Sequence, residues 1–165
     1  MPDREPLVIN TGPLLALIAA LGNVDVLADL YREVIVPLEV CEEIEAGGAA
    51  GFGVDVFQRA TRLAKRSAPV QAAPLLSRVL DRGEAAVIQL ALNEHIRTVA
   101  IDEPAGRRMA RLHGLDLTGS VGVLLRAKRE GRIASVRTAV ERMKNQGIWL
   151  SDRVVAFALR DSGEA

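Results

Sequence analysis

Apolar positions near the N-terminus change from a continuous run to a helical stripe. The run at 7–9, LVI, has β-branched members and is typical of a buried strand. After it, the apolar residues at 14, 17, 18 and 21 follow the spacing of an amphipathic helix. Thr11 is the expected N-cap, and Pro13 suits a first helical turn. Asn10 therefore ends a strand, at the edge where open parallel sheets bind ligands, although it could simply cap the helix.

The same alternation of strands and helices continues along the chain. Further strands are expected at 33–36, 98–101 and 115–117, and helices at 25–31, 38–46, 57–66, 84–95, 104–113, 121–130, 135–145 and 151–160. The helix at 84–95 is apolar almost all round and should be buried, so the glutamate at its start, Glu84, is notable. Four short strands alternating with helices predict an α/β fold with a mainly parallel sheet covered on both faces.

Length and composition indicate one globular domain spanning residues 1–165. The chain is 49% hydrophobic and 25% charged. No apolar run approaches the ~20 residues of a membrane span, so we expect no membrane contact. The N-terminus has no basic-then-apolar leader, so a cytoplasmic location is expected. Cys41 is the only cysteine, which excludes an intramolecular disulfide and a metal site built from several cysteines.

Charge is distributed unevenly although the total is zero. Residues 1–58 carry a net charge of −8, and residues 104–160 carry +8. This asymmetry indicates an anionic partner for the basic half or a basic partner for the acidic half. Alternatively, the two halves complement each other within the fold or a dimer.

Four polar side chains are expected near one edge of the sheet. Asn10 and Asp102 end strands, Glu84 opens the buried helix, and Glu43 lies on the helix after the second strand. Like charges about 4 Å apart repel by roughly 4 kcal/mol at an effective dielectric of about 20, and a hard divalent cation removes that repulsion. Mg²⁺ or Mn²⁺ would suit such oxygen ligands and could support phosphodiester cleavage. Taken singly, each acid could instead be a helix-start carboxylate or a surface group.

Three longer segments together resemble a known family. They are VINTGPLLALIAALGNVDVLADLYREVIVP, EVCEEI, and LDRGEAAVIQLALNEHIRTVAIDEPAGRRMARLHGLDLTGSVGVLLRAKREG. They resemble the stand-alone PIN-like proteins of bacteria and archaea, most closely a group related to the VapC-type toxins of toxin–antitoxin pairs. The resemblance covers about residues 6–160. It implies a three-layer α/β/α PIN-like fold and a metal-dependent ribonuclease site.

The resemblance also assigns site residues, with one departure. The family normally has an acid at the end of strand one, where this chain has Asn10. Glu43, Glu84 and Asp102 match the other acidic positions. After strand four, where a further acidic or hydroxyl residue often follows, the chain offers Thr118 and Ser120. Asparagine can offer its carbonyl oxygen to a cation but brings no charge, so the metal site should be weakened.

Two main functions remain open at this point. The chain is either an active metal-dependent ribonuclease of toxin type or a catalytically silent module that binds nucleic acid or protein; a metal-independent activity in the same pocket is a more distant alternative. In the first case Thr11 or Ser120 would orient metal-bound water.

Partners follow from the same resemblance and from the basic helices. Arg107, Arg108 and the other arginines of these helices would hold RNA phosphates, unless they form ordinary solvated faces. A small antitoxin protein would be the inhibitor, and we expect a homodimer. Trp149 and Phe157 are expected to pack the C-terminal helices onto the body or onto a partner subunit.

Overall fold

A five-stranded parallel sheet forms the centre of the computed structural model, which describes residues 4–47 and 51–165. The strand order is β3-β2-β1-β4-β5. The strands are β1 (Leu7–Ile9), β2 (Val34–Val36), β3 (Ala64–Lys65), β4 (Thr98–Ala100) and β5 (Asp116–Thr118). In the central register Val8 pairs with Ile35 on one side and with Val99 on the other. All strands therefore end at the same edge of the sheet.

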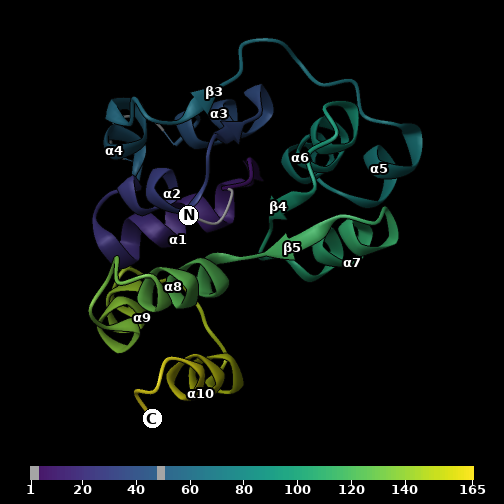
Figure 1. Cartoon of the computed structure of the whole chain (residues 1–165). Coiled ribbons are helices and arrows are strands. Elements are labelled where there is room, and N and C mark those ends of the chain that lie inside the picture. The colour runs from purple at the N-terminus through teal and green to yellow at the C-terminus, as the bar shows by residue number, and fades with distance from the viewer. Residues whose placement is uncertain (1–3, 48–50) are drawn as a thin grey trace.

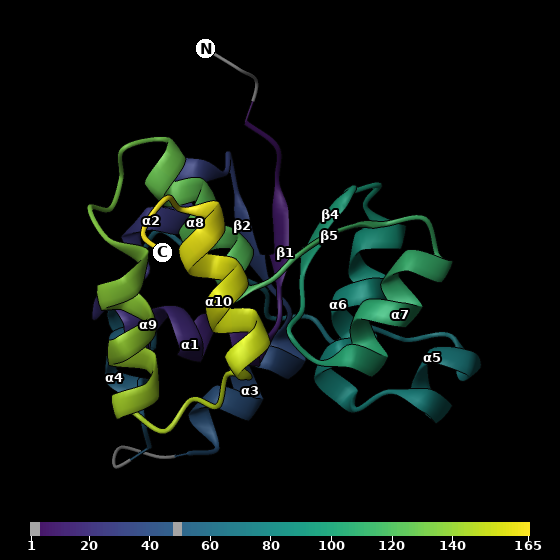
Figure 2. The ribbon, with the colours of Figure 1, turned by 90° about the horizontal axis from the view of Figure 1, so that it is seen from below.

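Helices cover both faces of this sheet. They are α1 (Thr11–Leu21), α2 (Asp25–Leu30), α3 (Leu38–Glu45), α4 (Val54–Arg59), α5 (Pro74–Val79), α6 (Arg82–Asn93), α7 (Pro104–Leu112), α8 (Ser120–Arg129), α9 (Val136–Asn145) and α10 (Asp152–Asp161). Helices α1, α8 and α9 lie on one side, and α5, α6 and α7 on the other, as Figures 1 and 2 show. Helix α3 contacts both α1 and α6. The predicted α/β fold of three layers is confirmed.

The core explains why the central strands and helices form where the apolar pattern predicts them. All three residues of β1 are fully buried, and so are Leu14 and Leu17 on the inner side of α1. A smaller apolar cluster joins α8, α9 and α10 through Leu125, Val136, Val140 and Ala158. Helix α10 buries only Ala158 completely, so it is the least embedded of the C-terminal helices. Within the described ranges, no helix has both the length and the apolar character needed to cross a membrane.

The segment before α6 departs from the sequence prediction. The expected helix at 57–66 is wrong: α4 ends at Arg59, and β3 follows at Ala64–Lys65 as a fifth strand. The reason is tertiary pairing, because the strand end is fixed by a hydrogen bond of 2.9 Å from the Arg66 N–H to the Val36 carbonyl. Helix α5, which begins with Pro74, was also not predicted.

The turn between β1 and α1 differs from the prediction by one residue. Thr11 is not the N-cap but the first residue of α1, and Asn10 is the cap, with extended backbone at φ −88° and ψ 168°. The Asn10 side chain makes no capping hydrogen bond. Asn10 therefore occupies the N-cap position, as the simple alternative predicts, but its side chain does not cap the helix and can bind another partner.

Candidate functional site

Three oxygen-bearing side chains surround Gly83 at the edge where the strands end. Asn10 follows β1, Glu43 lies on α3, and Asp81 precedes α6. A Cβ atom at Gly83 would lie 2.8 Å from Glu43 Oε2, 3.2 Å from Asn10 Oδ1 and 3.7 Å from Asp81 Oδ1. Only a residue without a side chain allows these oxygens to approach the start of α6 so closely.

Asn10 and Glu43 differ in how their oxygens are satisfied. Asn10 is 6% exposed, and its Oδ1 has no hydrogen-bond partner among the described residues. Glu43 Oε2 accepts a hydrogen bond of 3.0 Å from the Thr11 hydroxyl. A buried carbonyl oxygen without a donor is costly, so Asn10 Oδ1 is a natural ligand for a cation or a water molecule.

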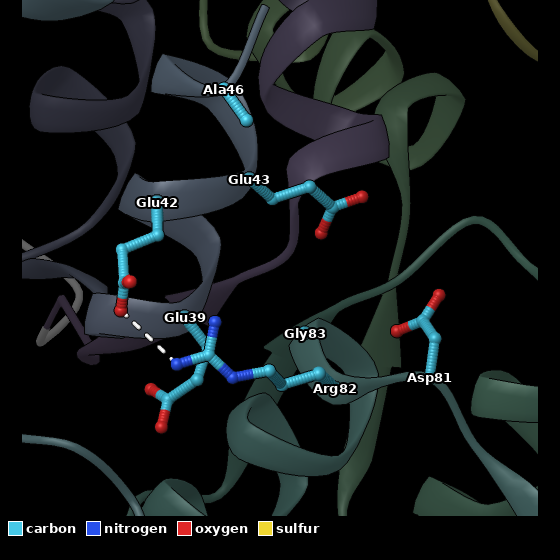
Figure 3. Close-up of a pocket in the computed structure, with 7 residues that line it drawn as sticks. All are labelled: Glu39, Glu42, Glu43, Ala46, Asp81, Arg82 and Gly83. Atoms are coloured by element: carbon cyan, nitrogen blue, oxygen red, sulfur yellow. Dashed lines mark hydrogen bonds and ion pairs between the residues drawn. The ribbon is translucent and has the colours of Figure 1, made fainter.

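An open cleft of about 420 Å³ lies between α3 and the start of α6. It is lined by Glu39, Glu42, Glu43, Ala46, Asp81, Arg82 and Gly83. Figure 3 shows Glu43 and Asp81 on the same side of Gly83, while Arg82 turns away toward Glu42, with which it forms an ion pair of 3.1 Å. The cleft therefore presents carboxylates to any ligand that enters it.

Glu84 is buried beside this cleft and is held by the local geometry of α6. Asp81 caps the helix by accepting a hydrogen bond of 2.8 Å from the Glu84 N–H. Burial, together with the negative charges of Asp81, Glu103 and Glu43, raises the pKa of Glu84 to about 7. The Glu84 Oε2 atom faces α7, 3.3 Å from where a Cβ of Gly106 would lie. Its carboxyl group thus titrates near neutral pH when no cation is near.

Asp102 lies at the same edge but turns toward β5 and α8. Its Oδ1 accepts a hydrogen bond of 2.8 Å from the Ser120 N–H, at the first residue of α8. Arg107 lies beside it, and its Nη1 donates to the carbonyls of Ile101, at 2.8 Å, and Thr118, at 3.3 Å. Burial lowers the pKa of the Arg107 guanidinium, and the nearby Asp102 carboxylate partly opposes this effect.

A comparison with known families matches nearly the whole chain. A family model described as a PIN domain matches residues 6–164. The chain belongs to the PIN-domain family. The search of curated proteins gives no match. PIN domains are nuclease-type modules that generally use divalent metal ions, and the family suggests binding to nucleic acid.

The acids of this PIN domain share one edge without forming a single cluster. Within residues 4–47 and 51–165, no three His, Cys, Asp or Glu side chains are grouped so as to hold a metal ion. Asn10 and Glu43 meet near Gly83, Glu84 faces α7, and Asp102 is engaged by α8. The oxygens around Gly83 nevertheless fit Mg²⁺, because this ion keeps several waters and is often held by only one or two carboxylates.

The remaining candidates lie at different distances from the cleft. Thr118 and Ser120 flank the end of β5, with Ser120 buried and Thr118 partly buried. Arg107 is partly buried at the sheet edge, whereas Arg108 is exposed on α7. Asp81, which lines the cleft, was not among the predicted site residues. The sequence does contain a pattern that points to it. An aspartate at the N-cap and a glutamate three residues later have the spacing of a capping box, which places two carboxyl groups close together.

Proposed function

We propose that this PIN domain is a divalent-metal-dependent ribonuclease of toxin–antitoxin type that cleaves single-stranded RNA. The observation that carries the proposal is the unpartnered, buried Oδ1 of Asn10, which faces the same point above Gly83 as Glu43 and Asp81. The raised pKa of Glu84 supports it, because crowded carboxyl groups favour a cation.

Asn10 and Glu43 would bind Mg²⁺ or Mn²⁺ directly. Glu84 and Asp102 would contact the ion through bound water molecules. The ion would supply Lewis acidity, which activates the attacking water and stabilises the leaving oxygen. The Thr11 hydroxyl fixes the Glu43 carboxylate, and the Ser120 N–H fixes Asp102. These two contacts keep both carboxylates oriented before substrate binds.

Arg107 and Arg108 would contact the RNA backbone beside the site. Thr118 would position the Arg107 guanidinium through its carbonyl. The toxin-type function also implies a small antitoxin protein and a homodimer. The acid-lined cleft supports such an inhibitor, because a basic side chain of a protein could enter it.

The test is cleavage of a mixed single-stranded RNA panel with Mn²⁺, with Mg²⁺ and with EDTA. Wild type, Asn10→Asp and Glu43→Gln are compared, and Glu42→Gln serves as the matched control because Glu42 pairs with Arg82 instead of facing Asn10. We expect wild type and Glu42→Gln to cleave, Glu43→Gln to lose activity by at least about tenfold, and Asn10→Asp to need less metal.

The second candidate function is a PIN domain that binds RNA but has lost catalysis. The uncharged Asn10 and the dispersed acids favour it. If only Asn10→Asp cleaves, this second function replaces the first. If no variant cleaves with either metal, the ribonuclease proposal is refuted.

A further inference from the structure

A groove of about 590 Å³ is lined in part by Asp102 and shares no lining residue with the acidic cleft. It lies between the start of α7, the turn from β5 to α8, and the segment 148–157, which contains the first part of α10. Its apolar lining includes Leu117, Val121, Ile148, Trp149, Val154 and Phe157. The size suits a ligand with the bulk of one nucleotide.

Two aromatic side chains in this groove, Trp149 and Phe157, are exposed, so the prediction that they pack the C-terminal helices onto the body is wrong, whereas packing onto a partner subunit stays a prediction. Trp149 is 83% exposed and Phe157 is 48% exposed. An indole ring that contributes so little to the core is free to offer a flat face to a ligand. Such a ring binds any nucleobase by stacking, because every base has a π-face.

A fixed cation lies in the same groove. The Nη1 atom of Arg107 is held by the carbonyls of Ile101, which follows β4, and Thr118, which ends β5. Among the described residues, the guanidinium makes no other hydrogen bond, so Nη2 and Nε can donate to an incoming anion. The Asp102 carboxylate lies near this guanidinium, but among the described residues it forms no ion pair with it, and its Oδ1 accepts a hydrogen bond from the Ser120 N–H. A guanidinium held in one orientation suits a phosphate.

We propose that this groove binds one nucleotide of the single-stranded RNA, with the base stacked on Trp149 and its phosphate at Arg107. The inference rests on the proposed function and names the subsite next to it. The groove combines an aromatic ring that can stack on the base with a fixed cation that can bind the phosphate. Its continuity with Asp102 would place the adjoining phosphodiester at the sheet edge. A purely apolar protein helix would bury the remaining N–H donors of Arg107 without offering them an acceptor.

The experiment uses Trp149 as its own reporter, because it is the only tryptophan in the chain. The full protein in EDTA is titrated with hexauridylate, hexaadenylate and an abasic ribose-phosphate hexamer. We expect the two base-bearing oligomers to quench the tryptophan emission to saturation, and the abasic oligomer to leave it nearly unchanged.

Binding of labelled hexaadenylate, measured by fluorescence anisotropy, then compares variants. Trp149→Ala should weaken binding roughly tenfold, whereas Trp149→Phe should restore most of it. Arg107→Lys should weaken binding less than Arg107→Gln, because lysine keeps the charge but not the planar fork. Leu112→Ala is the matched control: Leu112 is exposed on α7 and lies outside the groove, so binding should not change.

Several results would overturn the subsite. One is RNA binding without a change in emission. Another is emission that depends on protein concentration without RNA, which would assign the groove to a second copy of the chain. A third is the absence of any oligomer binding. The nuclease proposal fails separately. Quenching without cleavage in Mn²⁺ would refute catalysis and leave the subsite standing. Cleavage that Trp149→Ala does not change would refute the subsite and leave the nuclease standing.

Discussion

At the scale of single residues, Gly83 sets how closely the carboxyl groups approach one another. A methyl group there would lie 2.8 Å from Glu43 Oε2 and 3.2 Å from Asn10 Oδ1, so one of the two oxygens must move. Gly83→Ala should therefore lower Mn²⁺ affinity about tenfold, which corresponds to about 1.4 kcal/mol. The measurement is the rise in melting temperature with increasing Mn²⁺.

The matched control for this change is Gly12→Ala at the same edge of the sheet. A Cβ at Gly12 would have ordinary contact with Asp102 Cβ, at 4.0 Å. This variant should keep the full response to Mn²⁺. Equal responses in both variants would show that the oxygens around Gly83 do not hold the metal.

Glu84 links the stability of the fold to pH. Its pKa rises from 4.5 to about 7 on folding, chiefly because of burial and then because of Asp81. Between these values the folded chain binds a proton that the unfolded chain lacks, so stability falls as pH rises through this window. Glu84→Gln removes this loss and should stabilise the metal-free protein by up to about 3 kcal/mol at about pH 8, with little effect at about pH 4.

Urea unfolding in EDTA across this pH range measures the effect. Glu141→Gln, an exposed position on α9, provides the comparison and should follow the wild-type curve. Parallel pH curves for wild type and Glu84→Gln would contradict the assignment of a proton to this buried carboxyl group.

At the scale of elements, the attachment of α10 depends on one carboxylate beyond its end. Glu164 accepts hydrogen bonds from the Ser135 hydroxyl and the Val136 N–H, both at 2.7 Å, and pairs with Lys128 at 3.2 Å. Burial acts to raise the pKa of Glu164, but the hydrogen bonds from Ser135, Val136 and Arg137 and the contact with Lys128 lower it to about 2. The contact therefore tethers the C-terminal segment to the start of α9.

Glu164→Gln should destabilise the protein by about 1 kcal/mol near neutral pH, because a charged acceptor at the start of α9 is removed. The lowered pKa means that this stabilisation is complete above the ordinary value of 4.5 and is lost as pH falls toward about 2. Hydrogen exchange should report faster opening of α10 first, since its apolar anchor is small. Unchanged hydrogen exchange in α10 would contradict the proposal that Glu164 tethers the C-terminal segment.

Elements with a strong local pattern could be predicted, and elements made by distant contacts could not. Residues 7–21 carry their own apolar run and stripe, so β1 and α1 follow from the sequence. Strand β3 has two residues and no alternating pattern, and it exists because it pairs with β2. Glu39 illustrates the same limit: it is buried on α3 and accepts a hydrogen bond of 2.7 Å from the Val70 N–H, a contact with a distant segment that no local pattern contains.

The candidate site was predictable in its location more than in its geometry. The ends of parallel strands meet at one edge, which places Asn10 and Asp102 together from the sequence alone. The orientation of Asp102 toward Ser120 depends on where α8 begins, and the burial of Arg107 depends on β5. No local pattern contains this information, because both contacts join residues from separate elements.

At the scale of the whole molecule, no ion pair among the described residues joins the acidic half to the basic half. The described acids of residues 1–58 that form ion pairs contact Arg59, Arg62 and Arg82, outside the basic half. Cations of α8 pair with Glu130, in the same half, and with Asp161 and Glu164, which follow it. The alternative in which the two halves neutralise each other through direct pairs is therefore not supported within the described residues. The charge asymmetry remains available to an outside partner.

The affinity for RNA should consequently fall with rising salt, and only those cations that lack an acidic partner should contribute to this dependence. For single-stranded nucleic acid, the slope of log affinity against log salt changes by about 0.7 for each phosphate that the protein neutralises. Arg108 and Arg111 are exposed on α7, so replacing both with alanine should flatten the slope by about 1.4. Arg97 and Arg129 already pair with Asp116 and Asp161, so the matched double variant should keep the wild-type slope. Equal slopes in the two double variants would mean that α7 does not face the RNA, and the charge of the basic half would then have to act through another helix.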